Sequence, residues 1–202
     1  YAAFSEVMSH VELLTEMGIP DAKKMLGRYP FQLSGGMAQR VMLAMGVAMK
    51  PKVLIADEPT SNLDVTLQAE ILQRLKQLRD ERRTAILLIT HDLGVIAQMA
   101  DTVAVMYGGS IIEIADTRTL YERPLHPYTW GLFQTLPRLD SPGQGLRPLR
   151  GAPPTMLDPP DRCPYLDRCP KAVNPCRAEP MSPLVETEPG NWVACYNPIG
   201  YT

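Results

Sequence analysis

The stretch Leu33-Ser34-Gly35-Gly36-Met37-Ala38-Gln39-Arg40, followed by Val53-Leu54-Ile55-Ala56-Asp57-Glu58, decides the fold of this chain. In the first segment a serine and two glycines stand directly before a run of apolar residues at helical spacing. In the second, a short β-branched run ends in two adjacent carboxylates. A helix followed at once by an apolar strand is the repeating unit of α/β proteins, so we expect this fold class.

Periodicity extends the pattern in both directions. Ser34 is a good N-cap for a helix that Pro51 ends. The other predicted elements are two short helices within 1–33, a buried strand at 52–56, a helix at 65–79, a second buried strand at 85–89, a helix at 93–99, and a hairpin of strands 102–106 and 110–114. The alternation of strands and helices predicts a mostly parallel sheet covered by helices.

Composition limits the possible classes of protein. The chain has 202 residues, of which 45% are hydrophobic, enough for one ordinary domain and an appendage. A net charge of −2 without a basic block argues against nucleic acid as a partner. No apolar run approaches the roughly 20 residues that a membrane span needs. Because the first residue is Tyr1 and the opening segment already has a helical pattern, we expect this chain to be part of a longer protein.

Acidic residues and a histidine follow the two buried strands. Asp57 and Glu58 end the first strand, and His91 follows the second. The carboxyl ends of parallel strands meet at one edge of a sheet, where ligands bind. There Asp57 can hold Mg²⁺, Glu58 can polarise an attacking water, and His91 can contact a terminal phosphate. The structural alternatives are a polar turn before Pro59 and a surface histidine.

The Ser34-Gly35-Gly36 segment predicts an anion site. A helix start offers backbone N–H groups and the positive end of the helix dipole, and glycines allow a phosphate to approach the backbone closely. An ordinary N-cap after a glycine turn is the alternative. Asp64 is suited to cap the helix at Val65, and this role is compatible with a functional one.

Taken together, these segments resemble the nucleotide-binding subunit of an ATP-binding cassette (ABC) transporter. Residues 33–39 resemble the signature motif, with Met37 where many members have glutamine. Residues 53–58 resemble Walker B, residues 61–64 resemble the D-loop with Asn62 where alanine is commoner, and His91 matches the switch histidine. The match covers residues 1–120 and implies part of a P-loop ATPase core, whereas the phosphate loop G-x-x-x-x-G-K-[ST] is absent from the chain.

The resemblance implies a mechanism in which two subunits enclose two ATP molecules head to tail. Glu58 would be the general base, His91 the γ-phosphate sensor and Asp57 the Mg²⁺ ligand. The remaining nucleotide-binding positions would be Ser34, Gly35, Gly36, Met37 and Asp64. Without a phosphate loop, the isolated chain is expected not to hydrolyse ATP. The implied division is a signature-bearing helical subdomain at 1–50, the rest of the ATPase core at 51–122 and a C-terminal extension at 123–202.

The segment after the predicted ATPase core indicates which branch of the family the chain resembles. Arg123-Pro124-Leu125-His126-Pro127-Tyr128-Thr129 resembles the His-Pro-Tyr element of oligopeptide and dipeptide transporter ATPases. We expect it to pack the tail on the core. The resemblance implies import of oligopeptides or dipeptides, or of nickel or another small solute. It also implies a second ATP-binding subunit, two membrane-spanning permeases, an extracytoplasmic substrate-binding protein and a place at the cytoplasmic face of the membrane.

All four cysteines lie in the proline-rich tail, where we expect loops from Pro137 onward and no separate core. They are Cys163, Cys169, Cys176 and Cys195. Zinc usually takes a tight C-x2–4-C pair, which is lacking, and disulfides disagree with a cytosolic protein. A [4Fe–4S] cluster accepts four thiolates at loose spacing and is the favoured interpretation, with zinc, or unligated or disulfide-bonded cysteines, as alternatives.

Two further hypotheses about the whole chain stay open. One is a soluble ABC-type iron–sulfur protein that acts on ribosomes or DNA, for which a coiled-coil insertion or a basic patch would be expected. The other is a degenerate, non-catalytic subunit, against which the intact Asp57, Glu58 and His91 argue.

Overall fold

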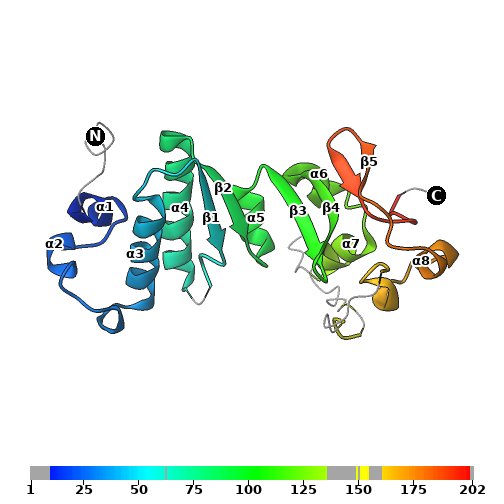
Figure 1. Cartoon of the computed structure of the whole chain (residues 1–202), viewed down its shortest axis with the longest axis horizontal. Helices are drawn as coiled ribbons and strands as arrows, with labels where there is room; N and C mark the ends of the chain where they lie inside the picture. The colour runs from blue at the N-terminus through cyan, green and yellow to red at the C-terminus, as the bar shows by residue number, and fades with distance from the viewer. Residues whose placement is uncertain (1–9, 62, 136–148, 150, 155–160, 201–202) are drawn as a thin grey trace, which may run out of the picture. The chain divides into compact units, whose positions relative to one another are not determined.

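The computed structural model describes residues 10–61, 63–135, 149, 151–154 and 161–200. The chain divides into two compact units, Tyr1–Met99 and Ala100–Thr202. Figure 1 shows the helices and strands of both. The finer division at residues 50 and 122 stays a prediction.

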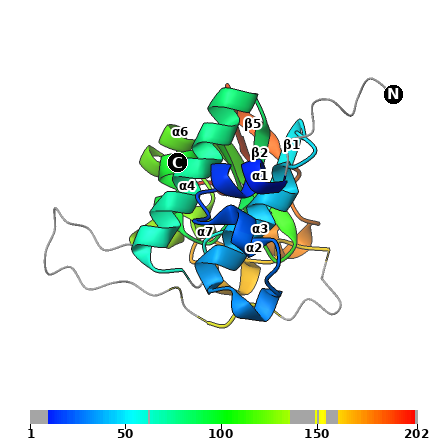
Figure 2. The same cartoon turned by 90° about the vertical axis from the view of Figure 1, so that its left-hand side faces the viewer.

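The first unit alternates helices and strands, as the sequence predicts. Its elements are α1 (His10–Glu16), α2 (Ala22–Met25), η2 (Pro30–Gln32), α3 (Gly35–Val47), β1 (Val53–Asp57), α4 (Val65–Arg82), β2 (Ala85–Ile89) and α5 (Leu93–Met99). Figure 2 views this unit from the side of α1 and α2, with α3 next and α4 behind it. The α/β fold class is therefore confirmed, and predicted and observed bounds agree closely.

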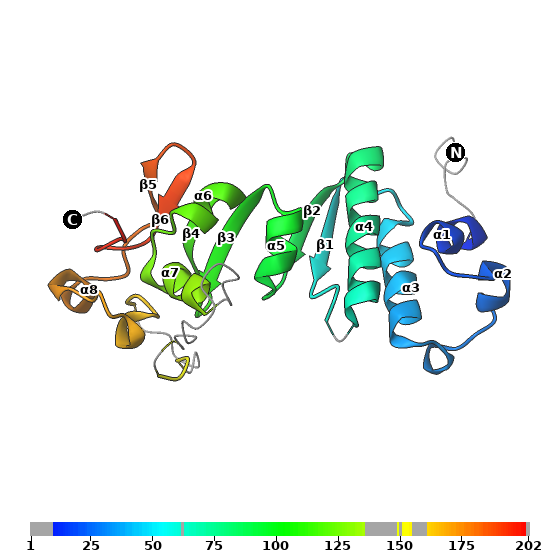
Figure 3. The ribbon, with the colours of Figure 1, turned by 180° about the vertical axis from the view of Figure 1, so that it is seen from behind.

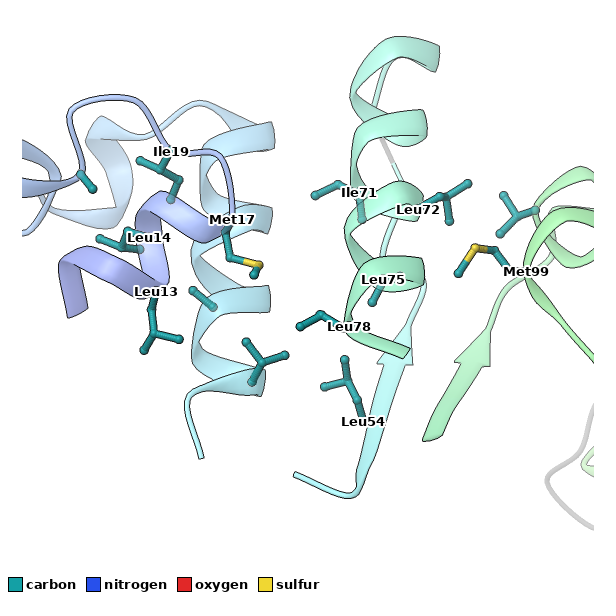
Figure 4. Close-up of a cluster of buried hydrophobic side chains, with 14 residues drawn as sticks. Leu13, Leu14, Met17, Ile19, Leu54, Ile71, Leu72, Leu75, Leu78 and Met99 are labelled. Atoms are coloured by element: carbon teal, nitrogen blue, oxygen red, sulfur yellow. The ribbon is translucent and has the colours of Figure 1, made fainter. Parts of the chain in front are cut away.

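Strands β1 and β2 pair in parallel and carry the core of this unit on one face. Val53 lies opposite Ala85, and Asp57 lies opposite Ile89. Leu54 of β1 packs with residues of α1, α3, α4 and α5 in one cluster. Figure 4 shows Leu72 of α4 facing Met99 of α5, while other α4 side chains point toward α3. Burial of this apolar face fixes the strands against the helices.

The other face of the pair differs from the sequence prediction. Both strands were expected to be buried, but the outward residues Val53, Ile55, Leu87 and Ile89 are 47–63% exposed. Side chains alternate along a strand, so a helix layer on one side buries only every second residue. Among the described residues that layer covers one face, and Figure 3 shows α4 beside β1 and β2 from behind.

The second unit is built on an antiparallel sheet. Its elements are β3 (Thr102–Tyr107), β4 (Ser110–Asp116), α6 (Thr117–Glu122), α7 (Pro127–Gln134), η3 (Leu166–Arg168), α8 (Asn174–Ala178), β5 (Val185–Glu188) and β6 (Asn191–Val193). The strand order is β3-β4-β6-β5, with every neighbouring pair antiparallel. The parallel pairing of the predicted sheet is thus seen in β1 and β2, whereas β3 and β4 pair in the antiparallel sense, as the predicted hairpin requires.

The turn between β3 and β4 explains this difference. Gly108 and Gly109 have φ of 53° and 78°, in the left-handed region that a two-residue hairpin turn requires. Two strands joined by so short a turn can pair only in the antiparallel sense. The predicted hairpin is confirmed.

The tail contributes more packing than the sequence suggests. Strand β6 pairs with β4, placing Val193 opposite Glu113. Tyr165 is 2% exposed and lies edge-on to Tyr107 of β3, with ring centroids 5.3 Å apart. Tyr128 contacts the same two rings. The expectation of loops from Pro137 onward is therefore wrong at η3, α8, β5 and β6, whereas the described tail residues form no separate core and extend that of the β3–β4 hairpin.

No described helix has both the length and the apolar character that crossing a bilayer demands.

Candidate functional site

The parallel pairing brings Glu58 and His91 together. Asp57 and Ile89 are register partners at the ends of β1 and β2, and Glu58 N–H donates to the carbonyl of Ile89 at 2.9 Å. Glu58 lies one residue beyond β1 and His91 lies two residues beyond β2, at the same edge of the pair. There His91 Nδ1 lies 2.7 Å from Glu58 Oε1. The predicted meeting of an acid and an imidazole at this edge is confirmed by the geometry.

Hydrogen bonds set the charge of this pair. Ser61 Oγ donates to Glu58 Oε2 at 2.6 Å. This bond, followed by the one with His91, lowers the pKa of Glu58 below its ordinary value. The same contact with Glu58 raises the pKa of His91. Glu58 is therefore ionised at neutral pH, and both of its oxygens are held in fixed directions.

The backbone at Glu58 is unusual. Its φ of 46° lies in the left-handed region, which glutamate seldom adopts. Such conformations cost free energy and tend to occur at functional sites. Gln39 of α3 donates from Nε2 to the carbonyl of Pro59 at 2.6 Å, so the turn after Glu58 is tied to the glycine-led helix. Asp57 stands beside it with an exposed side chain at the end of β1.

The glycine-led helix begins where the sequence predicts. Ser34 is the N-cap of α3, and its Oγ accepts from the backbone N–H of Met37 at 3.4 Å. The two glycines differ in their surroundings. A methyl group on Gly36 would meet Leu67 Cδ1 at 2.8 Å, whereas one on Gly35 would have no atom within 4 Å. Gly36 thus allows α3 to pack against α4, and Gly35 is open to an incoming ligand.

Two other predicted site residues, Asp64 and Met37, have structural roles in the first unit. Asp64 caps α4, its Oδ1 accepting from the N–H groups of Thr66 and Leu67, both at 3.0 Å. Met37 is half-buried and lines an apolar cavity of the first unit together with Val41 and Met45. Its side chain therefore packs inside the unit, and only its backbone N–H belongs to the exposed helix start.

Sequence reasoning missed two residues of this edge. Ser61 was included in a motif but not chosen as a site residue, although it holds Glu58 directly. Gln68 of α4 donates to Asp92 Oδ2 at 3.2 Å, and Asp92 in turn caps α5 through Gly94 N–H. The position of Ser61 three residues after the acid was an available signal. The link between Gln68 and Asp92 depends on packing, for which the sequence has no local sign.

The second unit gathers the four cysteines around one small cavity. Its wall consists of the cysteines with His126, Lys171, Leu166, Ser182, Ala194 and Tyr196. The thiols are close enough for their charges to interact, and each of the six pairs does so. Cysteines that are widely spaced in the sequence thus lie around the same cavity in the fold.

Burial and backbone N–H groups act on the cysteine sulfurs in opposite directions, and burial has the larger effect. Burial raises the pKa of Cys163 and Cys169, and it raises that of Cys195 to about 11. Backbone N–H groups act in the opposite direction, and each of these three sulfurs accepts one from the residue two positions on. The N–H of Asn197, for example, lies 3.4 Å from Cys195 Sγ. Such bonds favour the thiolate, which is the form that binds metals.

The four cysteines supply donor atoms that metals bind, but their side chains are not arranged as metal ligands. Among the described residues, no group of three or more His, Cys, Asp or Glu side chains is arranged to hold a metal ion. A cysteine has one side-chain torsion with three staggered positions, so a sulfur can turn toward the cavity without backbone movement. Four thiols around one cavity thus supply the donor atoms, but not the arrangement, of a four-thiolate group.

His126 and Glu113 anchor the tail to this region. Glu113 of β4 is 0% exposed and accepts two backbone N–H groups, that of Leu125 at 2.6 Å and that of His126 at 2.8 Å. The Nδ1 atom of His126 accepts from Tyr128 N–H at 3.0 Å and caps α7. Burial lowers the pKa of His126 to about 4. The expectation that His126 and Tyr128 pack the tail is confirmed.

Two family models match the chain. The model described as "ABC transporter" covers residues 6–61, and the model described as "Oligopeptide/dipeptide transporter, C-terminal region" covers residues 112–176. The first includes the glycine-led helix start and the two acids, and the second includes the His-Pro-Tyr element and three cysteines.

Curated relatives agree with both models. The oligopeptide transport ATP-binding protein OppD of Salmonella typhimurium is 46% identical over 94% of this chain and 56% of its own length. The dipeptide transport ATP-binding protein DppD of Bacillus subtilis is 48% identical over 87% of this chain and 51% of its own length. OppD of Haemophilus influenzae is 46% identical over 88% and 54%. The chain thus spans about half the length of the curated relatives it matches.

Proposed function

Because this chain belongs to the family of ABC transporter ATP-binding proteins, in its oligopeptide and dipeptide branch, we propose that it is part of an ATPase subunit that powers peptide import. The observation that carries this proposal is the contact of Glu58 with His91 at the carboxyl ends of two parallel strands. In the proposal residues 1–50 form the signature-bearing subdomain, residues 51–122 complete the ATPase core and residues 123–202 are the family-specific extension.

The proposed chemistry assigns a different task to each residue. Glu58 is ionised and held by Ser61 and His91, so it can accept a proton from an attacking water. His91 senses the terminal phosphate, because its proton is shared with a carboxylate whose surroundings change when a phosphate arrives. Asp57 supplies an exposed carboxylate to Mg²⁺, which neutralises phosphate charge when bound.

The helix start serves a second nucleotide. We infer that Ser34, Gly35 and Gly36 present backbone N–H groups to the γ-phosphate held by a second ATP-binding subunit. In this proposal the N–H of Met37 orients the Ser34 hydroxyl, and Asp64 lies at the contact between the two subunits. The open space at Gly35 supports this arrangement. Two membrane-spanning permeases and an extracytoplasmic binding protein complete the transporter, which places this subunit at the cytoplasmic face of the membrane.

The two glycines provide the sharpest test of the anion site. Gly35→Ala in the complete transporter should lower ATP turnover at least tenfold, because the added methyl group occupies the approach of the phosphate. The stability of the unit should not fall, since alanine is the better helix former and meets no atom. Gly36→Ala is the matched comparison and should destabilise the unit by about 1 kcal/mol, because Leu67 must shift. Full turnover in folded Gly35→Ala would contradict the anion site.

For the second unit we propose that Cys163, Cys169, Cys176 and Cys195 hold a [4Fe–4S] cluster that stabilises the tail. The support is the single cavity that all four line and the N–H groups directed at three of the sulfurs. A bound cluster joins four separate positions of the tail and so contributes to folding.

Elemental analysis tests this cofactor. Protein purified without oxygen should contain about four iron atoms and four sulfides per chain, from the composition of the cluster, and Cys195→Ser should lower both. Stoichiometric zinc without iron, or four free thiols by alkylation in the freshly purified protein, would remove the cluster from the proposal and leave the nucleotide site unaffected.

A further inference from the structure

His126 lines the cysteine cavity and has one ring nitrogen engaged in the helix cap. Nδ1 accepts the N–H of Tyr128, so Nδ1 carries no hydrogen and Nε2 carries it in the neutral ring. The side chain is 1% exposed and forms part of the cavity wall. Within the described part of the chain, no hydrogen bond from Nε2 is formed. Nε2 is not among the described side-chain atoms that are fully buried without a partner, so its N–H is accessible and remains available to an acceptor supplied by whatever occupies the cavity.

The other polar side chains of the wall already donate elsewhere. Lys171 Nζ donates to the carbonyl of Pro198 at 3.0 Å, and the hydroxyl of Tyr196 donates to the carbonyl of Pro180 at 3.0 Å. Ser182 Oγ donates to the carbonyl of Pro183. The single hydroxyl hydrogens of Tyr196 and Ser182 are thus used, so the wall residues that retain a donor for the cavity are His126 and the partly engaged ammonium group of Lys171.

We propose that Nε2–H of His126 donates a hydrogen bond to a sulfur of the thiolate-bound group in this cavity and thereby raises its reduction potential. The inference rests on the proposed cluster. A donor directed at sulfur stabilises the more negative, reduced state, which is how hydrogen bonds tune such groups. The His-Pro-Tyr element then has a second role besides capping α7: it supplies a positioning residue for the cysteine site.

Two substitutions separate the donor from the cap. His126→Asn keeps an acceptor close to the position of Nδ1, so the cap on Tyr128 survives while the distant donor is lost. His126→Gln is longer and places an amide donor near the position of Nε2, but its acceptor fits the cap poorly. His126→Asn thus keeps the cap and loses the donor, whereas His126→Gln keeps the donor and weakens the cap. The two substituted side chains have similar volumes.

The measurement is the midpoint potential of the full 202-residue chain, purified without oxygen and titrated with absorbance and electron paramagnetic resonance as readouts. His126→Asn should keep the iron content and shift the reduction equilibrium at least tenfold toward the oxidised form, which is 59 mV for one electron. His126→Gln should recover most of the shift. In wild-type protein labelled with ¹⁵N-histidine, the electron paramagnetic resonance signal of the reduced cluster should show a weak ¹⁵N hyperfine coupling. This measurement does not depend on the folding of any variant.

The outcomes distinguish this inference from the cofactor itself. A wild-type protein without iron overturns the cluster proposal and this inference with it. Normal iron with an unchanged potential in His126→Asn, or equal shifts in both variants, overturns the role of His126 alone. Absence of the ¹⁵N coupling in iron-loaded wild-type protein does the same.

Discussion

Glu58→Gln in the complete transporter should reduce ATP turnover by about 10²- to 10⁴-fold, the range that a general base contributes. The amide has nearly the volume of the carboxylate but cannot take a proton from water at neutral pH. The substitution also removes the charge that raises the pKa of His91. Nuclear magnetic resonance titration of His91 should therefore show its pKa falling toward the ordinary value, so that the ring loses its proton at a lower pH than in the wild type.

The matched control is Glu122→Gln, at an exposed carboxylate that pairs with Arg118 in α6. It should leave turnover unchanged, because surface pairs of this kind contribute little. Turnover of Glu58→Gln within twofold of the wild type would exclude Glu58 as the general base. A fall in turnover without any change in the pKa of His91 would mean that the observed contact between the two residues does not exist in the working protein.

Glu113→Gln should destabilise the second unit by about 2 to 3 kcal/mol, the cost of leaving a buried donor without an acceptor. Both neighbours of this carboxylate are donors, the N–H groups of Leu125 and His126. An ionised carboxylate offers two acceptors, whereas an amide offers one and turns its own N–H₂ toward the other. For a unit of about 100 residues, this loss corresponds to a fall in Tm of roughly 10 to 20 °C.

Thermal unfolding measures the loss, and hydrogen exchange locates it. The amide protons of Leu125 and His126 should lose protection in Glu113→Gln before the rest of the sheet. Glu186→Gln is the control, since Glu186 also accepts a backbone N–H, from Gly190 at 2.8 Å, but at an exposed position. It should change stability by no more than about 0.5 kcal/mol. Equal effects of the two substitutions would contradict a buried anchor at Glu113.

Local chemistry made much of the first unit predictable. The N-caps at Ser34 and Asp64 act through side chains two or three residues from their partners, so their signals lie within one turn of the chain. Helical and strand periodicity predicted α5 and β2 with their observed bounds. The edge on which His91 meets Glu58 followed from the parallel pairing of the two strands.

The short helix α6 and the strands of the tail were missed. Helix α6 has six residues and depends on the cap of Asp116 on Thr119 N–H, which is too short a pattern for periodicity to detect. Strand β6 is three residues long and forms only because β4 offers a free edge beside it. Segments this short gain their stability from partners elsewhere in the chain.

By itself the sequence determined the order of helices and strands, the identity of the acids and the histidine, and the family, because each depends on neighbours a few residues apart. The tertiary structure decided which glycine is open and which is packed, how Ser61 fixes Glu58, and that four widely spaced cysteines and His126 share one cavity. Those relations join residues distant in the sequence. They follow from burial and hydrogen-bond satisfaction over a whole unit, for which no local pattern of residues is a sign.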